Sequence, residues 1–545
     1  MAVKPDTGTP SCRLSLSDSA LEIRGECPGI RNKLRFWRKE IGFSERTRRK
    51  EVSGSFEDLY TVDRGNDGVW TLWTLPGFAH KVMEHCRENG IRFSFEDHRT
   101  PLPEPDDSAF DGLRDYQMDA VSAAVEAKGG IIKLPTGSGK TITSAAIIKA
   151  FPRAEMISRG TPTYVFSCPD KDINRKNWEA FKKMMPDRDV GIIMSGAHRP
   201  SDDIVCCTID SLENIDEDQV GVLICDEMHT ASSRSRMEKI MRFPRAARWG
   251  VSATPTGRFD GGDLVAEGLF GPIVFEMTYK DMVDRGALVP ITVYWIDCPD
   301  PHGGLSHYES LTSRDAKVRC AVVGNERMHM LVADILSCMP EELQTMCMVQ
   351  YIEHMAGIVS ALPEGSETKF VHGETNADKL VRYPVLKAIS PKERKEIYKQ
   401  VESGVIRSII ATYIYKQGVD FRDLSVVVNA AGGGSDIVAK QLPGRASRIS
   451  DGKTEAFMID FHHPWDTDQP VSRSGRGRAG PLLTADRQRS RAYEQLGFKQ
   501  KWVHSIRELP MLDRTRLDAL SREAAYTRGH AGADAKRLTR SRLLI

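Results

Sequence analysis

The chain has 545 residues, of which 40% are hydrophobic and 28% are charged, and its formal net charge at pH 7 is +1. This length exceeds one ordinary core and predicts about three or four domains of soluble composition. No run of about 18 apolar residues occurs, so no membrane span is expected, and residues 1–10 lack the segments of a secretion signal. The composition therefore favours a cytoplasmic protein.

The charge is unevenly distributed along the chain. Residues 471–545 hold 17 Lys/Arg against 7 Asp/Glu, a net charge of +10, and the remaining residues hold 59 against 68, a net charge of −9. Such local basic blocks bind phosphates even when the total charge is small. The 11 cysteines are scattered without a C-x-x-C pair, and we expect reduced thiols packed as small hydrophobic side chains.

Residues 1–108 are predicted to form a small α/β accessory domain that binds the substrate. It is expected to hold a helix that Gly90 ends. The expected strands and helix are Ala20–Gly25, Val69–Leu75, Phe78–Asn89 (the helix) and Ile91–Phe95. The Pro-rich, acidic residues 101–108 predict a linker.

A basic segment, Arg31–Lys50, lies inside this domain and has nine Lys/Arg against two Glu. Phe36, Trp37 and Phe43 alternate with its basic residues. Two interpretations stay open. The segment could stack on bases and hold phosphates, or it could be an amphipathic helix that buries its aromatic rings.

From residue 109 to 286 and again from 287 to 470, short apolar runs alternate with helical stretches. This pattern is typical of a parallel sheet covered by helices, and Gly286–Pro290 is expected to be a hinge between two such lobes. The expected strands are Ile131–Leu134, Thr163–Ser167, Ile204–Cys207, Val220–Cys225 and Trp249–Ala253, then Cys347–Gln350, Lys369–His372, Ser408–Thr412, Ser425–Asn429 and Phe457–Phe461. The predicted fold class is α/β, with two tandem parallel-sheet lobes, the N-terminal domain and a basic C-terminal extension over 471–545.

The segment Leu134-Pro-Thr-Gly-Ser-Gly-Lys-Thr141 follows an expected strand and opens an expected helix, which is the context of a P-loop. Gly137 and Gly139 let backbone N–H groups approach phosphate oxygens, and the helix start adds the positive end of its dipole. Lys140 is expected to reach the β and γ phosphates and Thr141 to bind Mg²⁺. The strict pattern has glycine in place of Leu134. The residues expected to bind nucleotide here are Thr136, Gly137, Ser138, Gly139, Lys140 and Thr141.

A second candidate catalytic motif is Asp226-Glu-Met-His229, directly after the expected strand Val220–Cys225. The strand is predicted to neighbour that of the P-loop. Asp226 is expected to complete the Mg²⁺ site, and Glu227 to orient and deprotonate the attacking water. His229 is included among the expected catalytic residues.

From this point the sequence resembles the superfamily 2 DExH-box helicases, whose motifs recur in order between about residues 109 and 470. The resemblance implies RecA-like lobes. It also implies that Arg114 and Gln117 contact the nucleotide, with the glutamine reading adenine. The residues implied to couple hydrolysis to lobe movement are Ser252, Ala253, Thr254 and Gln441.

The second lobe is implied to supply an arginine finger from Gln441-Leu-Pro-Gly-Arg-Ala-Ser-Arg448, with Arg445 and Arg448 facing the γ phosphate. An arginine from the other lobe would make hydrolysis depend on closure of the cleft. Gly418 and Asp420 resemble a motif that contacts the nucleotide. A nucleic-acid track over both lobes, held mainly through phosphates, is implied for Lys171, Thr208, Ser211, Gly373 and Thr412.

Within the superfamily the motifs most resemble phage branch-migration helicases, excision-repair helicases and restriction-enzyme motors. We therefore expect an ATP-dependent DNA helicase or translocase of repair, recombination or replication, with ATP and Mg²⁺ as cofactors. Its partner would be duplex, branched or single-stranded DNA, in the cytoplasm of the cell or of a phage host. A restriction motor subunit, an RNA helicase and an ATP-switched strand-annealing protein remain alternatives.

Overall fold

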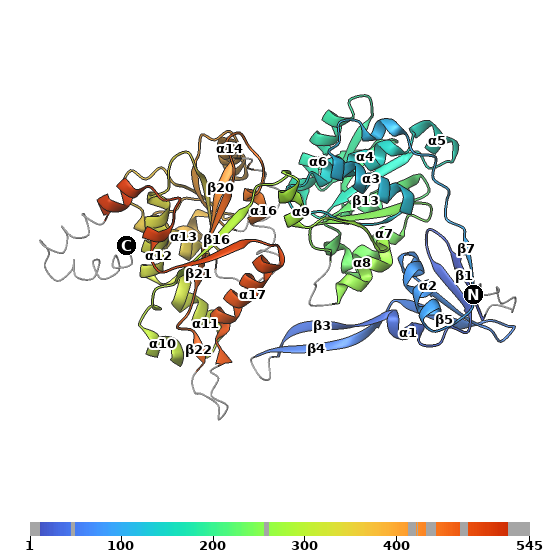
Figure 1. The fold of residues 1–545 in the computed structure, drawn as a ribbon, viewed down its shortest axis with the longest axis horizontal. Helices are drawn as coiled ribbons and strands as arrows, with labels where there is room; N and C mark the ends of the chain where they lie inside the picture. Colours follow the sequence, from blue (N-terminus) through green and yellow to red (C-terminus); the bar gives the residue numbers. More distant parts are fainter. Residues whose placement is uncertain are drawn as a thin grey trace, which may run out of the picture. The chain divides into compact units, whose positions relative to one another are not determined.

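The computed structural model describes residues 11–44, 49–255, 261–412, 421, 423–431, 443–468 and 478–520. The chain divides into two compact units (Figure 1). The first comprises Met1–Pro135 and Gly139–Met277, and the second comprises Thr136–Ser138 and Thr278–Ile545. No helix among the described residues is long and apolar enough to span a membrane.

The first unit begins with a five-stranded sheet in the order β5-β6-β2-β1-β7, in which only the β1–β7 pair is parallel. The expected helix and strands are present as α2, β2, β6 and β7. The elements are β1 (Cys12–Leu16), β2 (Leu21–Gly25), α1 (Ile30–Lys33), β5 (Tyr60–Arg64), β6 (Trp70–Thr74), η1 (Pro76–Phe78), α2 (Ala79–Glu88) and β7 (Phe93–Asp97).

Apart from Arg31–Lys33 in α1, the described part of the basic segment is not helical, so the interpretation as an amphipathic helix is wrong. It forms a long antiparallel ribbon of β3 (Arg35–Ser44) and β4 (Arg49–Asp58) that extends away from the N-terminal sheet (Figure 1). Cross-strand pairs stabilise such a ribbon. Trp37 and Phe56 face each other with ring centroids 5.0 Å apart, and the Arg35 guanidinium lies 4.2 Å from the centre of the Phe56 ring.

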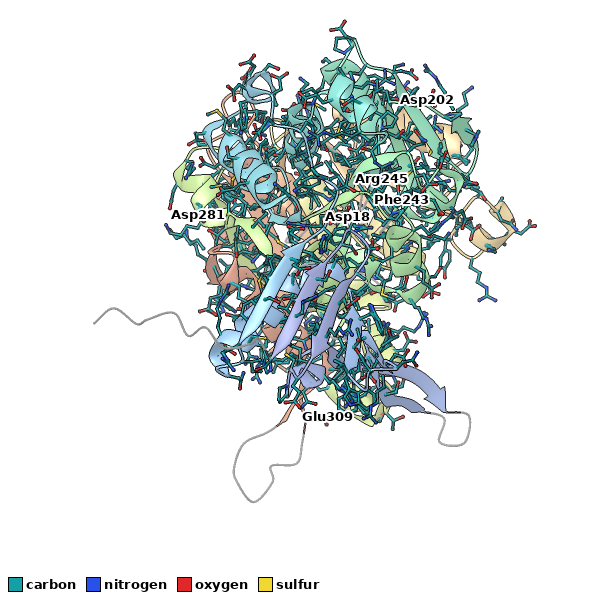
Figure 2. All side chains as sticks on the ribbon, turned by 90° about the vertical axis from the view of Figure 1, so that its right-hand side faces the viewer. Asp18, Asp202, Phe243, Arg245, Asp281 and Glu309 are labelled. Carbon is teal, nitrogen blue, oxygen red and sulfur yellow. The ribbon has the colours of Figure 1, made fainter. Side chains whose placement is uncertain are left out.

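The N-terminal sheet is docked on the first lobe within one unit. The buried Arg248 guanidinium donates to the backbone oxygens of Asp18 and Phe243, and these two residues lie close together in Figure 2. Glu267 in turn accepts hydrogen bonds from His80, at 2.9 Å, and Lys81, at 2.8 Å. These charge-assisted bonds, buried at Arg248 and half-buried at Glu267, hold the accessory domain and the lobe together.

The first lobe is an eight-stranded sheet in the order β11-β10-β12-β9-β13-β14-β8-β15, parallel except for the β10–β11 pair. Its strands are β8 (Gly130–Lys133), β9 (Thr163–Cys168), β10 (Val190–Met194), β11 (Ala197–Arg199), β12 (Ile204–Thr208), β13 (Val220–Asp226), β14 (Ala247–Ser252) and β15 (Ile273–Glu276). Its helices are η2 (Asp107–Phe110), α3 (Asp115–Ala127), α4 (Lys140–Ala150), α5 (Arg153–Ser158), α6 (Lys171–Met184), η3 (Ile209–Asn214), η4 (Met228–Ser232), α7 (Arg234–Met241) and α8 (Gly262–Phe270).

All five strands expected in this lobe are present, but their predicted adjacency is wrong in one place. The P-loop strand β8 does not pair with β13, because β14 lies between them and pairs with both. All seven residues of β13 are buried, as a central parallel strand requires. The inserted strand brings Ser252, its last residue, between the P-loop and the acidic pair.

The second lobe is a seven-stranded, fully parallel sheet in the order β18-β19-β17-β20-β21-β16-β24. Its strands are β16 (Ile291–Asp297), β17 (Gln344–Met348), β18 (Lys369–Val371), β19 (Ser408–Ala411), β20 (Leu424–Asn429), β21 (Ala456–His462) and β24 (Lys499–Val503), with a separate pair of β22 (Thr467–Asp468) and β23 (Arg478–Ala479). The α/β class with two parallel-sheet lobes is confirmed.

The helices of this unit are short at its start and longer over the sheet. They are α9 (Tyr279–Asp284), α10 (Leu305–Ser310), α11 (Arg314–Val318), η5 (Arg319–Val323), α12 (Glu326–Ser337), α13 (Ile352–Ala361), η6 (Ala377–Leu380), α14 (Pro391–Glu402), α16 (Pro443–Ala446), α17 (Pro481–Gln495) and η8 (Ile506–Glu508).

The second sheet continues past residue 470, where the sequence predicts a separate basic extension. β24 pairs with β16, and α17 packs against β21 and β24. The cause is a buried arginine. Arg489 of α17 donates to Asp460 of β21 at 2.9 Å and to Asp486 at 3.0 Å, and its side chain is only 1% exposed. Residues 481–503 are therefore part of the lobe.

Candidate nucleotide and nucleic-acid sites

The P-loop joins β8 to α4 at the carboxyl edge of the first sheet. Gly137 and Gly139 have φ angles of +88° and +83°, in the left-handed region that favours glycine. A Cβ on Gly139 would lie 2.7 Å from the Gln117 amide nitrogen. The buried Gln117 accepts the Arg114 backbone N–H at 3.0 Å. The start of α3, with both predicted adenine-side residues, thus lies beside the P-loop.

The acidic pair lies at the end of β13. Asp226 is buried, and its carboxylate accepts the Glu227 backbone N–H at 2.9 Å. Burial and the neighbouring Glu227 charge raise the pKa of Asp226 to about 7, while the Lys140 ammonium opposes this rise. A buried carboxylate beside a lysine, with the Thr141 hydroxyl at the start of α4, suits a divalent cation with oxygen ligands.

Glu227 has φ +50°, and a residue other than glycine in this region costs about 1–3 kcal/mol. The turn directs its carboxylate to His229, with Oε2 3.3 Å from Nδ1. His229 Nδ1 also lies 3.0 Å from the Ser252 hydroxyl, which accepts the Thr254 backbone N–H at 3.1 Å. The Glu227 carboxylate, the His229 ring and the Ser252 hydroxyl thus form a polar cluster at the ends of β13 and β14, in which Glu227 Oε2 itself has no hydrogen-bond partner among the described residues.

The sequence included His229 among the expected catalytic residues without a stated role. The structure places its ring between Glu227 and Ser252. Both His229 and Ser252 are buried. Ala253 follows directly in the chain.

Three residues predicted for the nucleic-acid track line one groove of about 380 Å³ in the first lobe: Lys171, Thr208 and Ser211. The two hydroxyls lie 2.8 Å apart. Asp210 and Glu213 also line this groove, but Asp210 pairs with Arg236 and Glu213 with Lys239, at 3.3 and 3.0 Å. Its acidic side chains are therefore balanced.

His198 of β11 lines the same groove and was not predicted. No signal in the sequence marks it, because the short β10–β11 hairpin gives no strong period-2 pattern.

In the second unit, two further track residues lie at the carboxyl ends of neighbouring strands. Thr412 follows β19 and donates its backbone N–H to Val371 of β18 at 3.1 Å. The Arg394 guanidinium donates to the Gly373 backbone oxygen at 2.9 Å. Carboxyl ends of parallel strands are the usual ligand edge of such sheets.

The remaining candidates lie in the second unit or outside the described residues. Arg445 belongs to α16 and Arg448 follows it. The segment Thr136–Ser138 also groups with the second unit. Gly418, Asp420 and Gln441 lie outside the described residues.

Two family models match the chain in tandem. One, described as "Type III restriction enzyme, res subunit", matches residues 111–257, and one described as "Helicase conserved C-terminal domain" matches residues 328–450. These ranges coincide with most of the first sheet and with much of the second.

Among characterised proteins, the chain is similar to the DNA 3'-5' translocase XPB2 of Sulfurisphaera tokodaii, with 27% identity over 388 residues, 67% of this chain and 84% of the relative. It is also 24% identical to the DNA 3'-5' helicase XPB of Kineococcus radiotolerans over 407 residues, 70% of this chain and 66% of the relative.

A solved structure shares the fold. It is a fragment described as an HsdR subunit of a type I restriction enzyme from Vibrio vulnificus, with a TM-score of 0.50 and 15% identity, covering 87% of this chain and 81% of the other.

Proposed function

We propose that this chain, which belongs to the superfamily 2 helicases, is a motor that hydrolyses ATP with Mg²⁺ to move along DNA. A helicase of this superfamily uses a nucleotide and a divalent metal ion and acts on nucleic acid. The choice of DNA is supported by two relatives whose names specify DNA, a translocase and a helicase. The DExH subtype, the domain boundaries before residue 471 and a cytoplasmic location stay predictions.

The observation that carries this proposal is the polar cluster of Glu227, His229 and Ser252 in the first unit. The Lys140 charge opposes the rise of the Asp226 pKa, and the Glu227 carboxylate and the Ser252 hydroxyl both lie beside His229 Nδ1. A structural ion-pair network would need neither a P-loop nor a strained glutamate. The combination matches a site that senses whether a γ phosphate is present.

The roles follow from this geometry. Lys140 would hold the β and γ phosphates, and Thr141 and Asp226 would hold the divalent cation, which neutralises phosphate charge when bound. Glu227 would orient a water molecule and accept its proton. The proton on Glu227 changes its interaction with His229 Nδ1, which lies 3.3 Å away.

Ser252 would couple hydrolysis to movement. Ser252 bonds both His229 and the Thr254 backbone, so a shift of the histidine is passed to the segment after β14. Arg445 and Arg448 would stabilise the charge on the transferring phosphoryl group when the lobes close.

The test is the steady-state ATPase rate of the full chain, alone and with single-stranded DNA, duplex DNA, a four-way junction or RNA, at one fixed low salt concentration because phosphate binding is salt-dependent. Strong stimulation by DNA is expected, and Glu227→Gln serves as the inactive control. Stimulation by RNA alone would replace DNA with RNA as the substrate. A rate unchanged by every nucleic acid would refute the motor.

A further inference from the structure

We propose that a groove between α17 and β24 of the second lobe binds single-stranded nucleic acid, with one base stacked on Trp502 and phosphates on Arg487 and Arg491. This inference rests on the proposed function and adds a contact outside the helicase motifs. The groove has a volume of about 490 Å³, which is within the usual range for small-ligand sites, about 300–1,000 Å³.

The aromatic part of the groove is an unfinished stack. Trp295 of β16 and Trp502 of β24 are direct cross-strand partners, and their rings lie nearly parallel, with centroids 6.0 Å apart and an interplanar angle of 13°. Trp295 is buried and its indole N–H donates to Gln500 at 2.8 Å. Among the residues that the structure describes, β24 is the last strand of the sheet, and none of these residues adds a strand beyond Trp502.

Trp502 is 52% exposed, which is unusual for a ring held so rigidly from below. A nucleobase has a flat π face and extends such a stack without any demand on its identity. The buried tryptophan fixes the orientation of the exposed one, so little side-chain freedom would be lost on binding.

The charged part of the groove comes from the exposed face of α17. Arg487 and Arg491 are four residues apart, so they lie on adjacent helical turns. Both are exposed, and neither has an acidic partner among the residues that the structure describes. Two guanidinium groups in a row suit successive phosphates.

The groove keeps this positive charge because its buried acids are already neutralised. Asp460 and Asp486 are bound by Arg489, and Asp486 also accepts from His463 at 3.0 Å. Burial opposes the charged form of His463, but Asp486 overcomes it and raises the pKa of His463 to about 10. Two negative and two positive groups therefore cancel beneath the groove.

This groove is distinct from the predicted track. The track residues Gly373 and Thr412 follow β18 and β19, whereas the groove lies at β16 and β24, five strand positions away. At about 4.8 Å per strand the separation is about 24 Å. A nucleic-acid strand bound in this groove would be a second segment of the substrate, such as the displaced strand of a branched DNA.

The experiment measures binding of a fluorescent 20-nucleotide single strand, as DNA and as RNA, to the full chain by anisotropy. Trp502→Ala and Arg491→Glu are each expected to weaken binding about tenfold, and Trp502→Phe should restore most of the affinity because it keeps a stacking ring. Lys499→Glu is the matched control. It makes the same charge change on β24, but its side chain lies on the opposite face of the strand from Trp502.

Nucleic-acid-stimulated ATPase at saturating duplex DNA should stay at the wild-type level in these variants, since none of the residues belongs to the motor motifs. Wild-type affinity in Trp502→Ala and Arg491→Glu, or equal losses in Lys499→Glu, would overturn the groove while leaving the motor intact. Lack of ATPase stimulation in the wild-type chain would instead overturn the proposed function.

Discussion

Replacing Arg489 with methionine should strongly destabilise the second lobe. The guanidinium is 1% exposed and donates to Asp460 at 2.9 and 3.0 Å, to Asp486 at 3.0 Å and to the Phe461 backbone oxygen at 3.1 Å. Its removal leaves two buried carboxylates with reduced compensation. Breaking a buried ion pair by removing one partner costs about 3–5 kcal/mol.

Asp460 and Asp486 keep other hydrogen-bond partners in this variant, so the expected loss of stability lies at the lower end of this range. Asp460 keeps the Tyr493 hydroxyl at 2.8 Å, and Asp486 keeps His463. We therefore expect a loss of about 3 kcal/mol in the free energy of unfolding, measured by urea and thermal unfolding of the full chain.

The matched control for this prediction is Arg491→Met on the same helix. It removes an exposed guanidinium and should change stability by less than about 0.5 kcal/mol. Equal stability of the two variants would refute the view that a buried arginine anchors α17 to the sheet.

Four further outcomes are expected. The difference in unfolding free energy between wild type and His463→Asn should be largest below about pH 6.5, where the histidine is protonated in both the folded and the unfolded state. It should shrink as the pH rises toward the folded-state pKa of about 10. A constant difference over this range in pH-dependent unfolding would contradict the stabilising role of protonated His463. Lys140→Ala should abolish nucleotide binding in a calorimetric titration, whereas Glu227→Gln should bind ATP and fail to hydrolyse it; an active Glu227→Gln enzyme would remove the general-base assignment. Ser252→Ala should keep ATP binding and lower strand displacement more than ATPase, and equal losses would place Ser252 in the chemistry. Arg448→Ala should lower turnover at least about 100-fold, by analogy with arginine fingers, with nucleotide affinity less affected; normal turnover would exclude a finger role.

The residues that local pattern predicts well are those whose chemistry and conformation are set by their neighbours in sequence. The P-loop requires glycine at positive φ, and Gly137 and Gly139 have it. Buried parallel strands are short and continuously apolar, so β9, β12, β13 and β20 could be predicted within one or two residues. Lys140 and Thr141 are then expected where the helix after the P-loop begins, and Asp226 where a buried strand ends.

Features that depend on distant partners could not be predicted in this way. Arg489 looks like any surface arginine until Asp460, 29 residues earlier, is placed beside it. The insertion of β14 between β8 and β13 is a choice of strand order that no local pattern records. The link from His229 to Ser252 depends on that order, so its chemistry was hidden as well.

The β3–β4 ribbon shows why the helical interpretation of the basic segment, one of the two left open, was wrong. Basic and aromatic residues alternate in Arg31–Lys50, which fits both a solvated helix and a two-stranded ribbon. The partner strand decides between them, because β4 offers Phe56 and Asp58 opposite Trp37 and Arg35.

Strand displacement from a branched DNA tests the proposed motor most directly, followed with ATP, without ATP, and with Glu227→Gln in place of the wild-type chain. We expect displacement only by the wild-type chain with hydrolysable ATP and Mg²⁺. Displacement that persists without ATP, or at the same rate in Glu227→Gln, would mean that hydrolysis at this site does not drive movement and would contradict the central claim.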